Sequence, residues 1–257
     1  MVSEPLAIAA ISAFVINGAF FAYAVARKTD VVTDLSYSLS FAFVSIVLIL
    51  LNAGSSPVTL LPAFLTIVWA GRLGAYLFTR IIKTKVDHRF DGMREVPLKF
   101  ARFWILQAIA VIVILLPVIA SAGSPEPARG FGFFEAAGLL LWAVGFIVEA
   151  LADGQKSRFK RNGGKGFMAT GLWKYSRHPN YFGESLLWWG IWVYALPGLS
   201  VIGHLSVLGP VFITVLLLFV SGIPLLEKSA DAKYGADSNY REYKRRTSIF
   251  VPLPPRN

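Results

Sequence analysis

Seven long apolar runs dominate the chain, and shorter polar segments separate them. The runs occupy approximately residues 6–26, 37–52, 57–79, 103–122, 131–152, 181–197 and 206–226. Each run is close to the ~20 residues that a helix needs to cross the hydrocarbon core of a bilayer, although the second and the sixth are short. The pattern predicts an all-α polytopic membrane protein with seven transmembrane helices.

Composition supports a bilayer as the solvent of this fold. Hydrophobic residues make up 55% of the 257 residues and charged residues only 16%, whereas about a quarter of the residues of a soluble domain are charged. A soluble fold of this size has too little interior to hide so much apolar surface. The chain has no cysteine, which excludes disulfide frameworks and thiolate metal sites. The three histidines lack zinc-ligand spacing, so we expect no metal site.

Basic residues gather in four of the segments that flank the runs. Of the 25 Lys and Arg residues, 23 lie within residues 27–28, 80–102, 153–177 and 228–256. Seven spans place these four segments on one side, which the positive-inside rule makes cytoplasmic. We therefore expect the N-terminus outside and the C-terminus in the cytosol. The net charge of +10 then reflects topology and contact with lipids, and we expect no nucleic-acid partner.

Polar side chains interrupt four of the predicted spans near their cytosolic ends. Spacings of three and four residues place the members of each set on one helix face. The sets are Asp34 with Tyr37; Arg72 and Tyr76 with Arg80; Glu149, Asp153 and Lys156 with Lys160; and Asn180 and Glu184 with Trp188. Ionisable groups inside a span usually face protein or water, so these sets predict a cationic, partly dry cavity for an anionic ligand. Interhelical salt bridges, for example Arg72 with Glu184, are the alternative.

The segment 171–184, GLWKYSRHPNYFGE, is too polar and too aromatic for a simple connector. Pro179 is a favoured first residue of a helix. The backbone amides of that helix start, together with Lys174 and Arg177, predict an anion site. An interfacial belt of aromatic and basic side chains is the alternative, and it leaves Asn180 and Glu184 unexplained. The preceding glycine-rich stretch has neither the dinucleotide fingerprint nor P-loop spacing.

The string RHPNYFGE at residues 177–184 resembles the C-terminal signature of the steroid 5-alpha-reductase family, in its bacterial branch. The similarity continues upstream in Glu149–Lys160, with the pattern ExxxDxxKxxxK, and downstream in Tyr240–Pro252, YREYKRRTSIFVP. It covers residues 145–255 well and the N-terminal half weakly. The shorter pattern RHPxYxG also occurs in isoprenylcysteine carboxyl methyltransferases and in some sterol reductases.

The resemblance implies a membrane enzyme that uses NADPH to reduce the carbon–carbon double bond of an α,β-unsaturated ketone by hydride transfer to the β-carbon. The type substrates of the family are 3-oxo-Δ4 steroids, and an apolar substrate of this kind would enter from the bilayer. We expect one domain, 1–257, in which residues 1–130 form the substrate-side helices and residues 131–257 the cofactor-binding region. We further expect a monomer in a bacterial inner membrane, with its active site facing the cytoplasm.

The resemblance also implies a set of cofactor-binding residues. Asn180 and Glu184 match family positions on the nicotinamide side, and Asp153 matches one near the adenosine end. The full expected set is Arg72, Arg80, Lys83, Asp153, Lys156, Lys160, Tyr175, Arg177, His178, Asn180, Tyr181, Glu184, Tyr243 and Arg245.

The family's catalytic acid pair is a glutamate after a glutamine on the second helix and a tyrosine on the third. Thr33–Asp34 aligns with the glutamine and glutamate, but the tyrosine position falls on Trp69, which has no phenolic proton. We therefore expect Asp34, Tyr37 and Tyr76 to supply the donor at the ketone oxygen, where negative charge develops. The alternative for Asp34 is a solvated helix-end charge or an N-cap.

Two other functions fit parts of the pattern. An S-adenosylmethionine-dependent methyltransferase, similar to the isoprenylcysteine carboxyl methyltransferases, would share RHPxYxG but would not need the polar faces of the second and third helices. A transporter or lipid-binding protein would be supported by an inverted repeat or by a polar path to the outer leaflet. The sequence shows neither feature.

Overall fold

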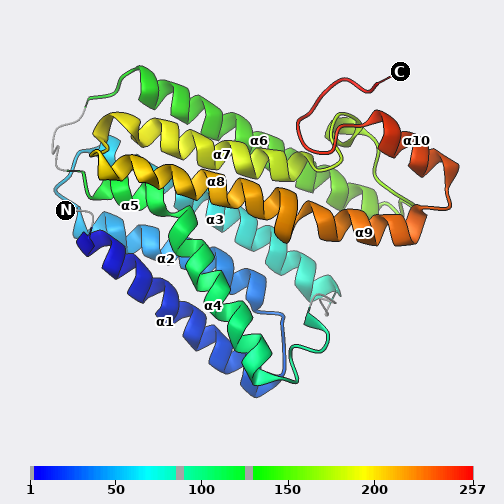
Figure 1. Cartoon of the computed structure of the whole chain (residues 1–257), viewed down its shortest axis with the longest axis horizontal. Coiled ribbons are helices and arrows are strands. Elements are labelled where there is room, and N and C mark those ends of the chain that lie inside the picture. The colour runs from blue at the N-terminus through cyan, green and yellow to red at the C-terminus, as the bar shows by residue number, and fades with distance from the viewer. Residues whose placement is uncertain (1–2, 85–89, 125–129, 257) are drawn as a thin grey trace. The chain divides into compact units, whose positions relative to one another are not determined.

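The computed structural model describes residues 3–84, 90–124 and 130–256, and every regular element in these ranges is a helix (Figure 1). The only extended pairing within them is an isolated parallel bridge between Ser176 and Ser248. The all-α prediction is therefore confirmed. The chain divides into two compact units, which we call the first unit (Met1–Glu135 with Tyr194–Gly209) and the second unit (Ala136–Val193 with Pro210–Asn257).

The first unit contains the N-terminal helices. They are α1 (Ser3–Arg27), α2 (Thr33–Leu51), α3 (Pro57–Thr84), α4 (Pro97–Ile114) and α5 (Leu116–Ala122). Helix α2 packs along α3, and α1 packs against both α2 and α4. Short 3-10 turns at Leu196–Gly198 and Ile202–Val207 complete the unit, and the second of them packs against α5.

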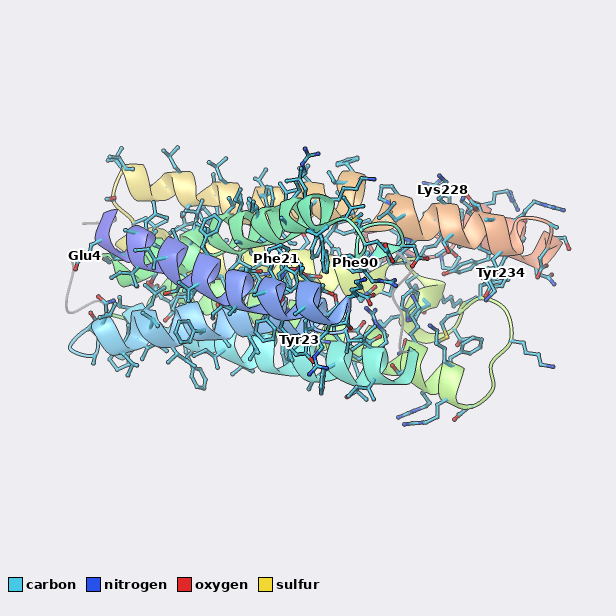
Figure 2. The ribbon with its side chains drawn as sticks, turned by 90° about the horizontal axis from the view of Figure 1, so that it is seen from below. Glu4, Phe21, Tyr23, Phe90, Lys228 and Tyr234 are labelled. Carbon is cyan, nitrogen blue, oxygen red and sulfur yellow. The ribbon has the colours of Figure 1, made fainter. Side chains whose placement is uncertain are left out.

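Aromatic side chains fill one end of the first unit. Phe90, Phe100 and Trp104 are buried together with Ala24, and Phe21 packs against them (Figure 2). The Phe100 and Trp104 ring centroids lie 5.8 Å apart with the rings steeply inclined, which is a favourable aromatic arrangement. This cluster joins α1 to α4 and to the short turn that precedes α4.

The apolar run predicted at residues 103–122 is two helices rather than one. Helix α4 ends at Ile114, and α5 begins at Leu116 with Pro117 in its first turn. Proline has no N–H for the helical ladder, and its ring clashes with the carbonyl of the preceding turn. The break was not predicted, because proline is tolerated in an apolar run and leaves the hydropathy of the run high.

The second unit contains most of α6 (Phe133–Arg161), the 3-10 turn η2 (Gly171–Lys174), α7 (Pro179–Ala195) and most of α8 (Leu208–Val215). A π-helical turn, η5 (Leu216–Val220), follows α8, and then come α9 (Ile223–Tyr234) and α10 (Ser238–Arg246). Lys228 lies near the middle of α9, and Tyr234 is its last residue (Figure 2).

Glycines bring α6 and α7 into backbone contact. A Cβ on Gly183 would lie 2.6 Å from the Gly145 carbonyl oxygen, and one on Gly190 would lie 2.5 Å from the Trp142 nitrogen. Both distances are shorter than real Cβ atoms allow, so only glycine fits at these two positions. Small residues serve the same purpose at helix interfaces in membranes. Gly183 of the RHPNYFGE string is therefore explained by packing.

Six helices among the described residues are long and apolar enough to cross a membrane. They cover residues 4–27, 33–51, 57–82, 97–114, 133–161 and 202–234. The expected span at 181–197 forms α7, which has 17 residues and is shorter than any of these six. The chain therefore has the helices of a multi-pass integral membrane protein.

Candidate functional site

The C-terminal half of α6 anchors the segment that leads into the RHPNYFGE string. The Leu172 N–H donates to Gln155 Oε1 at 2.9 Å, and Trp173 Nε1 donates to the Ala152 carbonyl oxygen at 3.1 Å. Gly171 has φ +63°, a backbone conformation that favours glycine, and the end of the Gln155 side chain lies close to it. Lys156 Nζ sits 4.5 Å from the centre of the Trp173 ring, a cation–π contact.

The C-terminal segment lies alongside the same string. The Arg177 N–H donates to the Ser248 carbonyl oxygen at 2.8 Å, and the Ser176 hydroxyl donates to the Phe250 carbonyl oxygen at 2.7 Å. The Leu253 N–H in turn donates to the Tyr175 carbonyl oxygen at 3.0 Å. Two of the sequence regions that carried the resemblance, about 70 residues apart along the chain, are thus hydrogen-bonded to each other.

Glu227 on α9 joins three cationic or titratable side chains. Its carboxylate accepts from Arg177 Nη1, lies 2.9 Å from His178 Nε2 and lies 3.3 Å from Lys244 Nζ. Lys244, on α10, also pairs with Asp231 at 2.6 Å. Ion pairs and hydrogen bonds through Glu227 therefore connect the start of α7 to α9 and α10. Sequence reasoning missed Glu227 and Asp231, although two acids four residues apart on one helix face in a strongly basic segment were a usable signal.

Several polar atoms at the start of α7 are buried and lack a hydrogen-bond partner within the described residues. They are Arg177 Nε, His178 Nδ1 and Asn180 Oδ1. Burial lowers the pKa of His178, although its hydrogen bond to Glu227 opposes the shift. Buried polar atoms are rarely left unpaired in native proteins. These three atoms therefore mark a place where a polar ligand would supply the hydrogen bonds that they lack.

The predicted acids on α6 and α7 are buried in the second unit. Glu149 is 2% exposed, Asp153 4% and Glu184 8%. The backbone contact between Gly183 and Glu149 holds the first turns of α7 against this part of α6, since a Cβ on Gly183 would lie 2.6 Å from the Glu149 nitrogen. The second unit therefore gathers these acids with the string that contains Asn180.

The other predicted residues of the second unit take varied positions. Tyr181 stacks on His178 with ring centroids 5.9 Å apart, and the Tyr243 hydroxyl donates to the Trp173 carbonyl oxygen at 2.7 Å. Burial raises the pKa of Tyr243, so its phenol keeps its proton at neutral pH. Lys160 and Tyr175 are exposed, and so is Arg245, which is paired with Glu242 at 2.8 Å.

The predicted catalytic and basic residues of α2 and α3 lie in the first unit. Asp34 forms an ion pair with Arg80, with Arg80 Nη2 3.0 Å from Asp34 Oδ2. The N-cap of α2 is Val32, which makes no side-chain cap, so the N-cap alternative for Asp34 is wrong. Asp34 is the second residue of α2, which begins at Thr33.

Tyr37 lies edge-on to Phe41, and Phe41 lies edge-on to Trp69, with ring centroids 4.9 and 5.1 Å apart. Trp69 is 1% exposed, so the tryptophan that stands at the family's tyrosine position is part of the packed core. Arg72 and Tyr76 are half-buried on α3. Lys83 lies at the end of α3, and its side chain is outside the part that the structure describes.

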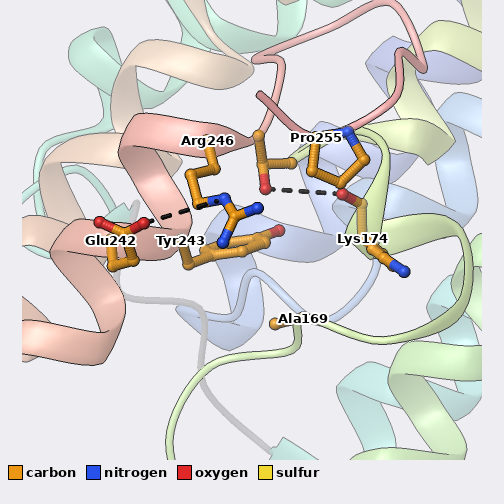
Figure 3. Close-up of a pocket in the computed structure, with 7 residues that line it drawn as sticks. Ala169, Lys174, Glu242, Tyr243, Arg246 and Pro255 are labelled. Atoms are coloured by element: carbon orange, nitrogen blue, oxygen red, sulfur yellow. Dashed lines mark hydrogen bonds and ion pairs between the residues drawn. The ribbon is translucent and has the colours of Figure 1, made fainter. Parts of the chain in front are cut away.

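A surface pocket of about 410 Å³ opens beside α10 (Figure 3). Lys174, Tyr243 and Arg246 contribute to its walls, and the Thr247 hydroxyl donates to the Lys174 carbonyl oxygen at 3.5 Å. Arg246 also interacts with Glu242, 3.8 Å away, and donates to the Arg256 carbonyl oxygen at 2.7 Å. The walls therefore combine Lys174, Arg246 and the Tyr243 ring with one acidic residue, Glu242, and the excess of cationic groups suits an anionic ligand.

The fold and the buried polar groups define a helical, multi-pass membrane protein with a candidate ligand site at the start of α7. The chain belongs to the family described as "Protein of unknown function (DUF1295)", whose model matches residues 20–247. The "Uncharacterized protein C594.04c" of Schizosaccharomyces pombe is similar to it, at 27% identity over 226 residues. That alignment covers 74% of this chain and 62% of the yeast protein, so the chain spans less than two thirds of that relative. No solved structure matches.

Proposed function

We propose that this protein is an NADPH-dependent reductase of the carbon–carbon double bond of an α,β-unsaturated ketone, with 3-oxo-Δ4 steroids as the substrate class. The proposal is supported by the RHPNYFGE string and by the two regions that resemble the steroid 5-alpha-reductase family on either side of it. An apolar substrate of this class would reach the protein from the bilayer, since several of its helices expose apolar side chains along their length.

The observation that carries the proposal is the buried, unpartnered Oδ1 of Asn180, within the described residues, at the first turn of α7. An acceptor there fits the amide N–H of a nicotinamide ring. Arg177 Nε, also buried without a partner in this part of the chain, is a donor of the kind that phosphate oxygens accept. The residues present therefore fit NADPH in donor and acceptor chemistry.

The basic residues of the second unit would hold the phosphate-rich part of the cofactor. Lys174 and Arg246 line the pocket beside α10, and a 2′-phosphate requires a cation beyond those that an NADH site needs. Lys156, Lys160 and Arg245 remain predicted contacts of this kind. Asp153 and Glu184, both buried, remain the predicted contacts of the adenosine and nicotinamide ends.

When bound, NADPH supplies the hydride for the β-carbon of the enone. The protein must then supply a hydrogen-bond donor to the ketone oxygen, where negative charge develops. Tyr37 and Tyr76 are the proposed donors, and Asp34, whose carboxylate is paired with Arg80, would act through one of these tyrosines. The ion pair between Asp34 and Arg80 fixes the orientation of the Asp34 side chain, which favours a role for Asp34 in positioning charge at this end of α2.

We further propose that the chain has seven spans, in which α7 is added to the six longer helices. Its 17 residues extend about 26 Å at 1.5 Å per residue, close to the hydrocarbon thickness. With seven spans, the basic segments lie on the cytoplasmic side of a bacterial inner membrane, and the site at the start of α7 faces the cytoplasm. The proposed functional form is a monomer in contact with lipids.

A methyltransferase that uses S-adenosylmethionine is the second candidate function. The observation in its favour is that the RHPxYxG residues and the unpartnered atoms at the start of α7 all belong to the second unit. This function would leave the polar face of α2 and α3 without a role.

The test of the reductase is a product analysis with labelled cofactor. Purified protein in detergent is incubated with a 3-oxo-Δ4 steroid and NADPH that carries deuterium at C4 of the nicotinamide. We expect a saturated ketone with one deuterium on the former β-carbon. Unchanged steroid, together with methylation of an isoprenylcysteine when S-adenosylmethionine is added instead, would support the second candidate.

A further inference from the structure

The contact between His178 and Glu227 determines which nitrogen of the imidazole carries the hydrogen. His178 Nε2 lies 2.9 Å from Glu227 Oε1. Glu227 also meets two permanent cations, because Arg177 Nη1 donates to its other oxygen and Lys244 Nζ lies 3.3 Å from that oxygen. A carboxylate held among cations only accepts hydrogen bonds, so the hydrogen must be on Nε2.

The opposite nitrogen of the same ring is then an acceptor. His178 is 5% exposed, and its Nδ1 is buried with no hydrogen-bond partner among the described residues. Burial lowers the pKa of His178, whereas the hydrogen bond to Glu227 and the charge of Glu227 raise it, and the nearby charges of Lys156 and Arg177 lower it. The net shift of the pKa is downward, which favours a neutral ring. A neutral imidazole with its hydrogen on Nε2 has only a lone pair at Nδ1. Leaving that lone pair buried and unpaired is unfavourable, so a donor from a ligand would be stabilised there.

We propose that Glu227 is a positioning residue that holds His178 in the Nε2-protonated tautomer, and that His178 Nδ1 accepts a hydrogen bond from an O–H or N–H of the bound dinucleotide. The identity of the ligand rests on the proposed function, whereas the tautomer does not. Asn180 Oδ1, two residues further on, is a second buried acceptor of the same kind. The start of α7 thus combines two acceptors with the donor Arg177, which suits a ligand that has both amide or hydroxyl donors and phosphate acceptors.

The surroundings of Glu227 suit this role better than a role in stability alone. A carboxylate needed only to tie α9 to α7 would be satisfied by Arg177, which is the shortest of its contacts. The second oxygen of Glu227 is instead committed to His178, whose ring is also stacked on Tyr181. The imidazole is therefore fixed both in its plane and in its tautomer, as in sites where one nitrogen of a histidine is presented to a ligand.

The first experiment measures the tautomer in the absence of any ligand. Protein labelled with ¹⁵N in histidine contains only three histidines, and the His178→Asn variant identifies the signals of His178. Near neutral pH we expect a neutral ring with its hydrogen on Nε2. Glu227→Ala should release the ring into a mixture of tautomers, and Glu227→Gln, which keeps an acceptor oxygen, should restore the single tautomer in part. A hydrogen on Nδ1, or a doubly protonated ring, in the unmutated protein would overturn the proposal.

The second experiment tests the two ring nitrogens of His178 one at a time, with substitutions whose side-chain amide takes the place of one nitrogen. The side-chain amide of asparagine reaches the position of Nδ1, and that of glutamine reaches the position of Nε2. His178→Asn should therefore keep NADP⁺ affinity within a few-fold. His178→Gln should weaken it by about tenfold, the loss expected for one neutral hydrogen bond, while keeping its melting temperature closer to that of the unmutated protein.

The reverse order of affinities, or equal affinities, would overturn the ligand contact. If the unmutated protein does not bind NADP⁺ at all, the proposed function fails and the ligand contact fails with it, but the ¹⁵N result still decides the role of Glu227. A repeat with the nicotinic acid analogue of NADP⁺, which lacks the amide N–H, identifies the donor. If His178→Asn still binds the analogue more tightly than His178→Gln does, the hydrogen-bond donor is a hydroxyl of the ligand. If the two variants bind the analogue equally, the donor is the amide.

Discussion

Gly183 of α7 lies against Glu149 of α6 so closely that a Cβ on Gly183 would come within 2.6 Å of the Glu149 backbone nitrogen. One substitution therefore tests whether this contact holds the candidate site together. Gly183→Ala should destabilise the protein by about 1–3 kcal/mol, because the added methyl group must push two backbones apart. Thermal or denaturant unfolding in detergent measures the change.

Gly154→Ala is the matched control for this substitution. Gly154 lies on α6, the helix that Gly183 packs against, and a Cβ there would meet nothing within 4 Å. Alanine in a helix is favourable by about 0.4–1 kcal/mol over glycine, so this variant should be neutral or more stable. Equal stability of the two variants would show that α6 and α7 do not pack by their backbones.

Asn180 and Glu184 test whether the start of α7 holds the nicotinamide. Asn180→Ala and Glu184→Gln should reduce turnover far more than they lower the melting temperature, because each substitution would remove a contact with the nicotinamide. Ser185→Ala is the control on the same helix, because the Ser185 hydroxyl is bonded to Thr214 at 2.6 Å. That variant should cost about 1 kcal/mol of stability and leave turnover nearly intact. Parallel losses of fold and activity in Asn180→Ala and Glu184→Gln would mean that these two residues are structural.

Asp34 is the residue proposed to orient the donor to the ketone oxygen, since its own carboxylate is paired with Arg80. Loss of such a donor costs about 10²–10³-fold in turnover, so Asp34→Ala should lose roughly that much while NADPH binding changes little. Tyr37→Phe and Tyr76→Phe then show whether a phenol takes part. Asp91→Ala, which removes an exposed carboxylate paired with Arg94 in the same unit, is the control and should be nearly normal. Near-normal turnover in Asp34→Ala, on any enone that the protein reduces, would remove Asp34 from the mechanism.

Topology is tested by reporters at the C-terminus. Seven spans place the C-terminus in the cytosol, so an alkaline phosphatase fusion should be inactive and a green fluorescent protein fusion should be bright. A truncated fusion after residue 200, which follows α7, should give the opposite pattern if α7 spans the membrane. A cytosolic signal after residue 200 together with a C-terminus outside the cytosol would reduce the count to the six longer helices, because the helix at 202–234 still separates the two positions.

The membrane helices could be predicted because a run of apolar residues is a local signal that a bilayer imposes on every span. The break between α4 and α5 could not be placed in the same way, because Pro117 lies within a run that stays apolar on both sides. The start of α2 also lies earlier than expected, at Thr33, since polar residues in the first turn of a helix do not contribute to an apolar run.

The candidate site was predicted only where its residues are close in sequence. Arg177, His178 and Asn180 stand together in one string, and their burial could be expected from it. Glu227 is about 50 residues away and contacts them only after α9 has packed, so its spacing from Asp231 could mark it as a candidate but could not show which residues it contacts. The backbone hydrogen bond from Arg177 to Ser248 involves no particular side chain, and no residue pattern encodes it.

The most direct test of the central claim is the effect of NADPH on the melting temperature of the purified protein. A ligand at about 100 times its Kd adds roughly 2.7 kcal/mol of stability, which for a chain of this length is a rise of about 5 °C or more. We predict that rise with NADPH and little change with S-adenosylmethionine at the same concentration. We also predict that Asn180→Ala lowers the effect of NADPH. A rise with S-adenosylmethionine and none with NADPH would contradict the account and favour a methyltransferase.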